Sequence, residues 1–124
     1  MKKKILIVDD NVDILFTIKK GLEHLDENYD VYLAQNEKKF FEQMENKKKP
    51  DLILLDIMMP DINGWDLFAK IKENSNWNSI PIVFLTAKTD GYSIGFGKKN
   101  ADAYLTKPFE IKTIKETMDN IFRQ

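Results

Sequence analysis

Two short runs of apolar residues, each ending in aspartate, constrain the fold of this 124-residue chain more than any other feature. Residues 5–8 (Ile-Leu-Ile-Val) precede Asp9 and Asp10, and residues 52–55 (Leu-Ile-Leu-Leu) precede Asp56. Uninterrupted apolar runs of this length are typical of strands buried on both faces, as in parallel sheets. The sequence therefore predicts a parallel sheet with carboxylates at the ends of two of its strands.

Segments with strand and helix character alternate along the whole chain. Strand-like runs are expected at residues 4–9, 31–34, 51–55, 80–85 and 103–105. Apolar residues at helical spacing separate them, with Asn11 or Asp10 as a cap for the first helix and Asn36 for the second. The first helix would bury Leu15, Ile18, Leu22 and Leu25, and the last would carry Ile111, Ile114, Met118, Ile121 and Phe122.

Five strand–helix units of this kind predict an α/β fold, a doubly wound parallel sheet with helices on both faces. Periodicity does not choose between the two common strand orders of such sheets. A fourth helix within residues 88–99 would contain Gly91, Gly95 and Gly97. Each interior glycine costs a helix about 0.5–1 kcal/mol relative to alanine, so a short or frayed helix is expected there.

Composition narrows the class of protein. Apolar residues make up 43% of the chain and charged residues 31%, and the length fits a single domain over residues 1–124. The formal charge of -1 gives no general signal for direct nucleic-acid binding or a membrane surface. The chain contains no cysteine, and its apolar runs are too short for a signal peptide or a membrane span. We expect a cytoplasmic protein without membrane insertion.

Polar side chains follow the predicted strands where they would share one edge of the sheet. Asp9 and Asp10 end the first strand, Asp56 the third and Thr86 the fourth, and Lys107 follows the fifth. Three neighbouring carboxylates would repel one another, and Mg²⁺ is the natural cation for an all-oxygen site. The set suits phosphoryl transfer: a carboxylate as nucleophile, Thr86 as hydrogen-bond donor, and the metal with Lys107 neutralising charge.

Each of these residues also has a simpler explanation when taken alone. Asp10 can cap a helix, Asp56 can accept N–H groups of the following loop, Thr86 can bond to backbone, and Lys107 can be an exposed lysine. Their joint occurrence after successive strands favours a shared site. A metal-dependent phosphohydrolase is a rival interpretation, but it would call for an Asp-x-Asp motif that residues 9–11 (Asp-Asp-Asn) do not supply.

With these residues identified, the sequence resembles the receiver domain of the two-component response-regulator family, of the single-domain chemotaxis type. The matching blocks are residues 5–10, 51–60 with Gly64, 81–87 and 103–109, and the similarity runs from Lys3 to the last helix. The resemblance implies a flavodoxin-like (βα)5 fold with strand order 2-1-3-4-5 and a site at its switch point.

The resemblance also implies residue roles at a metal and phosphorylation site. Asp56 would be the phospho-acceptor. Asp10 and Asp56 would bind Mg²⁺ directly, together with the backbone carbonyl of Met58, and Asp9 would act through water. Lys107 would pair first with Asp56 and then with the phosphoryl group.

A second group of implied roles concerns the switch. Thr86 would move to bond the phosphate, and Tyr104 would rotate inward as Thr86 moves. Asn100 stands where the family often has glycine, and the glycines at 91–97 are unusual for the family. Asparagine tolerates the left-handed conformation better than most residues, so Asn100 is compatible with the turn. The three glycines affect the shape of the surface that partners of the family usually read.

The implied partners are a histidine kinase or phosphotransfer protein as donor, and a downstream protein on the face of the fourth helix, fifth strand and last helix. No enzymatic activity is expected beyond the chain's own phosphorylation and dephosphorylation. The alternative is a receiver-like binding module that is never phosphorylated. Such a module would be indicated by the loss of one of the aspartates or of the lysine of the site. Asp9, Asp10, Asp56 and Lys107 are all present.

Overall fold

The computed structural model describes residues 2–45, 49–57, 63–86, 102–106 and 109–124. The strands are β1 (Lys3–Val8), β2 (Tyr29–Ala34), β3 (Leu52–Asp56), β4 (Ile82–Thr86) and β5 (Ala103–Thr106). The described helices are α1 (Val12–Leu25), α2 (Glu37–Met44), α3 (Gly64–Glu73) and α5 (Ile111–Phe122). The predicted fourth helix, at residues 88–99, lies outside the described residues.

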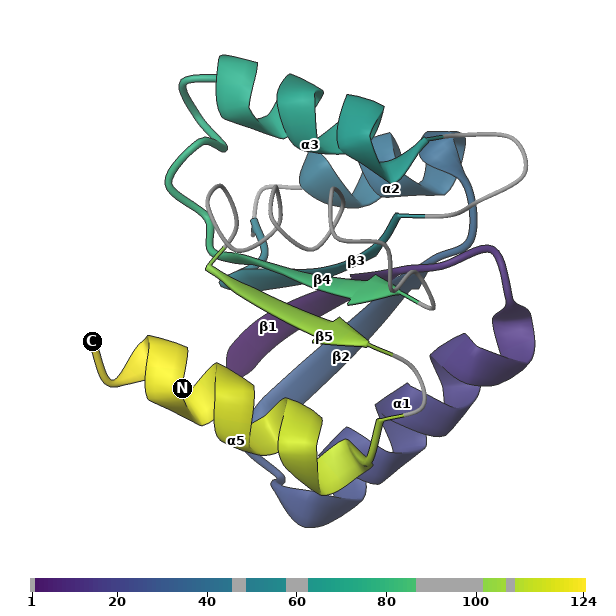
Figure 1. Ribbon diagram of the computed structural model, residues 1–124, viewed down its shortest axis with the longest axis vertical. Coiled ribbons are helices and arrows are strands. Elements are labelled where there is room, and N and C mark those ends of the chain that lie inside the picture. Colours follow the sequence, from purple (N-terminus) through teal and green to yellow (C-terminus); the bar gives the residue numbers. More distant parts are fainter. Residues whose placement is uncertain (1, 46–48, 58–62, 87–101, 107–108) are drawn as a thin grey trace.

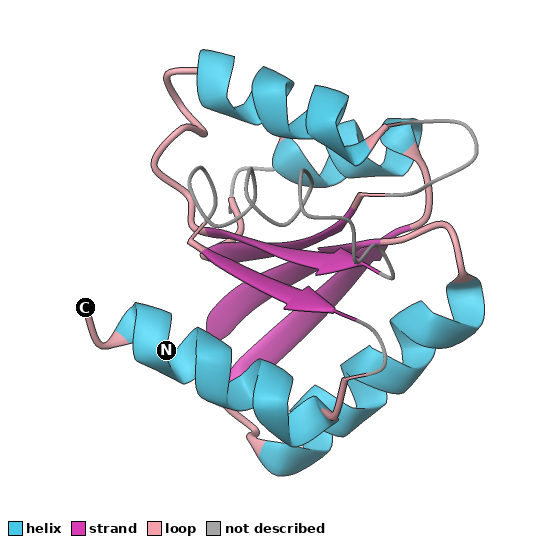
Figure 2. Cartoon of the chain, in the orientation of Figure 1, coloured by secondary structure: helices cyan, strands magenta, loops and turns pink. Residues whose placement is uncertain are grey.

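The five strands form one parallel sheet between two helical layers. Their order is β2-β1-β3-β4-β5. Helices α1 and α5 cover one face, and α2 and α3 cover the other (Figure 1). The same layering is visible by element type in Figure 2. The predicted doubly wound α/β fold is confirmed, as is the order 2-1-3-4-5, which the residue pattern left open and the resemblance implied.

Alternation along the strands divides the core between the two faces. In β1, Leu6 and Val8 belong to the core on the α2–α3 side, while Ile5 and Ile7 belong to the core on the α1–α5 side. Successive side chains of a strand point to opposite faces, so a strand covered on both sides must be apolar throughout. This is the physical reason that the two aspartate-terminated runs contain no polar residue.

Asparagine side chains fix where three helices begin. Asn11 Oδ1 accepts the Ile14 N–H at 3.2 Å, and Asn36 Oδ1 accepts the Lys39 N–H at 2.8 Å. Asn63 caps α3 in the same way. Of the two predicted caps for α1, Asn11 is the one used.

One predicted core residue is wrong, and every strand differs from its predicted bounds by one or two residues at one end or both, with β2 and β4 shifted most at their starts. Leu25 is 47% exposed because it is the last residue of α1, where the chain leaves the helix in an extended conformation. Strand β2 starts at Tyr29 because it pairs with Lys3 of β1. Strand β4 starts after Pro81, which has no N–H to donate, and extends through Thr86. Among the described helices, none has both the length and the apolar composition needed to cross a bilayer.

Candidate functional site

The carboxyl ends of β1 and β3 bring three aspartates together. Val8 and Leu55 are register partners in these neighbouring strands, so the residues that follow them emerge side by side. Carboxylate oxygens from Asp9, Asp10 and Asp56 all lie within 4.8 Å of one another. The predicted meeting of the three carboxylates is confirmed.

The cluster is partly removed from water. Asp9 and Asp56 are 2% and 3% exposed, whereas Asp10 is exposed. Oδ1 of Asp9 accepts the Asn11 N–H at 3.0 Å. Like charges at this spacing repel, and burial makes each charge harder to solvate. A hard divalent cation with oxygen ligands would relieve both costs, so the donor set fits Mg²⁺.

Backbone contacts hold the segments that carry the cluster. The Asp9 N–H donates to the Ala34 carbonyl at 3.2 Å, which ties the end of β1 to the end of β2. Asp56 is the register partner of Leu85 in β4. The Gly64 N–H at the start of α3 donates to the Ile57 carbonyl at 2.9 Å. The aspartates therefore emerge from hydrogen-bonded backbone rather than from long loops.

The other predicted site residues are placed only in part. Thr86 is the last residue of β4, and its backbone pairs with Thr106 of β5 on the same edge of the sheet as the aspartates. Met58 and Lys107 lie outside the described residues. The structure therefore assembles the acidic part of the predicted site.

Tyr104, the predicted switch residue, is half-buried on β5 beside an aromatic cluster. Its ring centroid lies 6.4 Å from that of Phe84 on β4. Trp65 and Phe68 of α3 pack on the same Phe84 ring, with centroid separations of 4.7 and 5.2 Å. These contacts depend on how α3 lies on the sheet, so no local pattern in the sequence shows them.

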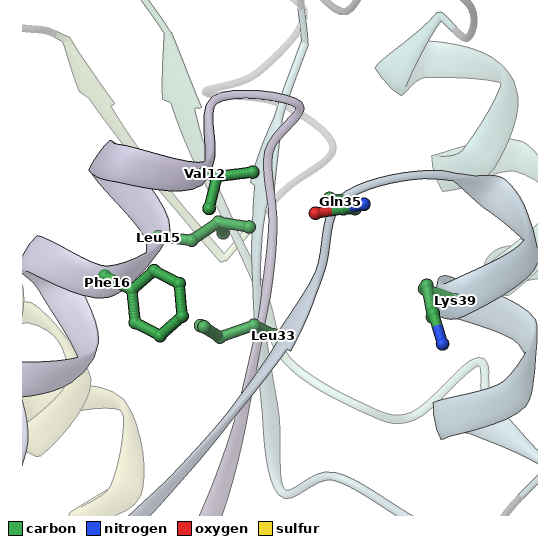
Figure 3. A pocket seen from close by; sticks show the side chains of 6 residues that line it. All are labelled: Val12, Leu15, Phe16, Leu33, Gln35 and Lys39. Atoms are coloured by element: carbon green, nitrogen blue, oxygen red, sulfur yellow. The ribbon is translucent and has the colours of Figure 1, made fainter.

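A depression of about 220 Å³ lies between α1, the end of β2 and α2 (Figure 3). Its lining residues are Val12, Leu15, Phe16, Leu33, Gln35 and Lys39. Phe16 is 50% exposed, a feature that sequence reasoning missed because helical spacing alone does not say which apolar side chains stay in solvent. The lining has one cation and no carboxylate, so it does not have the chemistry of a metal site.

Comparison with known proteins agrees with this geometry. The model of the response regulator receiver domain family matches residues 5–119. Response regulator ArlR of Staphylococcus saprophyticus is 40% identical over 112 residues, which cover 90% of this chain and 48% of that protein. The alkaline phosphatase synthesis transcriptional regulatory protein PhoP of Bacillus subtilis is 34% identical over 125 residues, covering 100% of this chain and 50% of that protein.

Solved structures of similar proteins share the whole fold. The chemotaxis protein CheY4 of Vibrio cholerae has a TM-score of 0.86 at 26% identity, with 97% of this chain and 98% of that chain covered. A putative response regulator from Chloroflexus aurantiacus has a TM-score of 0.87 at 27% identity, with 100% of both chains covered. The chain spans about half the length of the two curated relatives named above. With a family match over residues 5–119 and three aspartates gathered at the sheet's carboxyl edge, the chain belongs to the response regulator receiver domain family.

Proposed function

We propose that this chain is a phosphorylation switch in which Asp56 accepts a phosphoryl group in a reaction that requires Mg²⁺. The observation that carries the proposal is the approach of the Asp9, Asp10 and Asp56 carboxylate oxygens to within 4.8 Å of one another. Receiver domains interact with histidine kinases and downstream effectors, and the donor here would be a histidine kinase or phosphotransfer protein.

The proposed transfer is a displacement at phosphorus. A carboxylate oxygen of Asp56 forms a bond to the phosphorus of a phosphohistidine. The phosphorus–nitrogen bond breaks, and its electron pair returns to the imidazole. The product is an aspartyl phosphate, a mixed anhydride. The position of Asp56 supports this role, because it ends the central strand β3 and lies among the carboxylates that would hold the metal.

The metal-binding residues in this proposal are Asp10 and Asp56, with the backbone carbonyl of Met58, while Asp9 acts through water. A bound Mg²⁺ would neutralise the carboxylates and the charge on the transferring phosphoryl oxygens. The chemistry of the donor set supports the proposal, since carboxylate oxygens are the ligands that this hard cation prefers.

The proposed output starts at Thr86 and Lys107, which would engage the new phosphate, and Tyr104 would rotate in response. A downstream protein would then bind the face that the resemblance assigns to the predicted fourth helix, the fifth strand and the last helix. Among similar solved structures is a BeF3-activated receiver domain of DrrB, with a TM-score of 0.84 at 26% identity. Its activated form supports a switch of this kind without identifying a target.

The proposal is tested by incubation with acetyl phosphate and Mg²⁺, followed by electrophoresis that retards phosphoproteins. We expect one phosphorylated species for the native chain and none for Asp56→Asn. Asp66→Asn, which neutralises an exposed acid in the first turn of α3, is the matched control and should be labelled like the native chain. Labelling that persists in Asp56→Asn, or that does not need Mg²⁺, would contradict the proposal.

A further inference from the structure

Gly64, the first residue of α3, packs directly against the backbone of Asp56. A Cβ atom at position 64 would lie 2.4 Å from the Asp56 carbonyl oxygen and 2.6 Å from the Ile57 Cα. Real Cβ atoms essentially never come within 3.0 Å of another heavy atom in this way. Because the obstructing atoms are backbone, they cannot rotate aside, so only glycine fits this close approach.

Gly21 in α1 shows the contrast. The three atoms nearest to a Cβ placed there are side-chain atoms of Ile111, at 2.8, 2.9 and 3.1 Å. They belong to a half-buried, β-branched side chain at the start of α5, whose movement costs packing energy but displaces no backbone atom. Both glycines are helical and tightly packed, but only Gly64 packs against the residue proposed to accept the phosphoryl group.

Asp56 is held from two sides. On one side its backbone pairs in register with Leu85 of β4. On the other, the Gly64 N–H donates to the Ile57 carbonyl at 2.9 Å, and Asn63 Oδ1 accepts the Trp65 N–H at 2.8 Å to fix the start of the helix. The backbone of Asp56 is therefore set by the packing of α3 as well as by the sheet.

We propose that Gly64 is a positioning residue for Asp56: its missing side chain lets α3 seat the Asp56 backbone where the carboxylate meets Asp9 and Asp10. This inference rests on the proposed function. Gly64 then sets part of the geometry of the metal and phosphorylation site, although it touches neither the metal nor the phosphoryl group.

Gly64→Ala should therefore move Asp56 while leaving the rest of the fold in place. Displacement of a reacting group by about 1 Å can cost about 100-fold in rate, so we expect the rate of phosphorylation by acetyl phosphate to fall by about that factor. We expect the apparent Kd for Mg²⁺ to rise about tenfold, since affinity depends on the same carboxylate geometry. Alanine is the better helix former, so weakened helix propensity would not explain either loss.

The test compares the native chain, Gly64→Ala and the control Gly21→Ala by isothermal titration with Mg²⁺ and by the Mg²⁺-induced rise in Tm. The rise in Tm reports binding to the folded state without requiring turnover. Gly21→Ala should match the native chain within about twofold in Kd, because the atoms it would displace belong to the Ile111 side chain and not to the backbone of Asp56. If Gly64→Ala is largely unfolded, the same titrations are made in sucrose, which favours the compact state.

The outcomes separate this inference from the proposed function. A native chain that binds no Mg²⁺ and accepts no phosphoryl group would overturn both. Suppose instead that the native chain binds Mg²⁺ and is phosphorylated, and that Gly64→Ala has the same Kd for Mg²⁺ and the same phosphorylation rate. That result would overturn only the role of Gly64. Failure of Gly64→Ala to fold even in sucrose, with Gly21→Ala folded, would also overturn it, because the contact would then support the whole fold rather than the site.

Discussion

Asp10 differs from its two neighbours in the acidic cluster because it is exposed while Asp9 and Asp56 are buried. Its charge can therefore be removed without leaving a hole in the core. The three carboxylate oxygens lie within 4.8 Å of one another, so in the absence of a cation each ionised group raises the free energy of the folded state.

Asp10→Asn should stabilise the metal-free protein and weaken metal binding. Removal of one like charge near the protein surface should raise the free energy of unfolding in EDTA by about 1 kcal/mol. The Mg²⁺-induced rise in Tm should shrink, because one ligand is lost. Thermal unfolding in EDTA and in Mg²⁺ measures both effects.

Asp13→Asn is the control for that prediction. Asp13 lies in the first turn of α1, where a negative charge is favourable to the helix dipole. Its neutralisation should lower stability by about 0.3–1 kcal/mol and leave the Mg²⁺ effect unchanged. If Asp10→Asn instead lowers the free energy of unfolding in EDTA, as Asp13→Asn should, the three carboxylates do not repel one another enough to destabilise the fold.

At the residue scale, the sequence predicts site residues that follow the ends of strands. It does not predict residues whose role comes from close packing between elements. Asp9, Asp10 and Asp56 could be predicted because a carboxylate after an apolar strand must lie at the edge of the sheet. Gly64 could not, because its spacing does not show that α3 begins against the Asp56 carbonyl. The exposure of Phe16 also depends on the packing of neighbouring elements.

Strand β2 is an edge strand, and α1 satisfies part of its outer edge. Successive residues of a strand direct their N–H and C=O groups alternately to one side and the other. The Ala34 carbonyl accepts the Asp9 N–H, so the N–H and C=O of Val31, three residues earlier, point away from β1. Oε2 of Glu23 accepts the Val31 N–H at 3.1 Å, and Lys19 Nζ donates to the Val31 carbonyl at 2.7 Å. Lys19 and Glu23 also pair at 2.9 Å.

The double variant Lys19→Met/Glu23→Met should leave that edge open. Unpaired edge groups invite pairing with another chain, so we expect concentration-dependent dimers in sedimentation equilibrium. We also expect a loss of about 1–2 kcal/mol in the free energy of unfolding. Lys39→Met/Glu42→Met removes an exposed pair on α2, 3.5 Å apart, and should sediment like the native chain. Equal behaviour of the two double variants would refute a role for α1 at the edge.

Helix α5 is fixed by a polar network at the other end of the sheet from the aspartates. Asp119 accepts hydrogen bonds from Tyr29 and from Lys115, the latter at 2.6 Å, and Lys115 also lies 3.7 Å from Asp26. Burial alone would raise the pKa of Asp119, but the hydrogen bonds from Lys115 and Tyr29 outweigh it and lower that pKa. Burial and the bond to Asp119 raise the pKa of Tyr29.

Asp119→Asn should therefore destabilise the protein in a pH-dependent way. A carboxyl whose folded pKa is lowered contributes stability above its unfolded pKa of about 3.9 and loses it as pH falls through the folded value. The variant should be less stable than the native chain by about 1–2 kcal/mol at pH 7, and the gap should close below about pH 4. Urea unfolding across this range measures the gap. Glu116→Gln, at an exposed position of the same helix, should show no such closing gap.

At the element scale, the type of each element follows from its periodicity, but its ends and its partners do not. The pattern of Leu15, Ile18, Leu22 and Leu25 predicts the first helix, and the first three are buried while Leu25, at its end, is exposed. Tyr29 and Asp119 are 90 residues apart, and no local pattern connects them. Their contact exists only because α5 packs on the face of the sheet that carries Tyr29, at the start of β2.

For the whole molecule, strand order decides whether there is a site. In the observed order β2-β1-β3-β4-β5, β1 and β3 are neighbours, so their aspartates meet. In the other common order, 3-2-1-4-5, a strand would separate them, and strand spacing of about 4.8 Å would place them about 9–10 Å apart. Periodicity does not distinguish the two orders, and the resemblance to receiver domains was needed to predict the one observed.

The most direct test of the central claim locates the phosphoryl group among the three aspartates. The native chain is treated with acetyl phosphate, with and without Mg²⁺, and then with borohydride, which reduces an aspartyl phosphate to an alcohol. Peptide mass mapping should find the reduced residue at Asp56 when Mg²⁺ is present, and no reduced residue when EDTA replaces it. Reduction at Asp9 or Asp10, or reduction at Asp56 that is unaffected by EDTA, would contradict a magnesium-dependent acceptor at the end of β3.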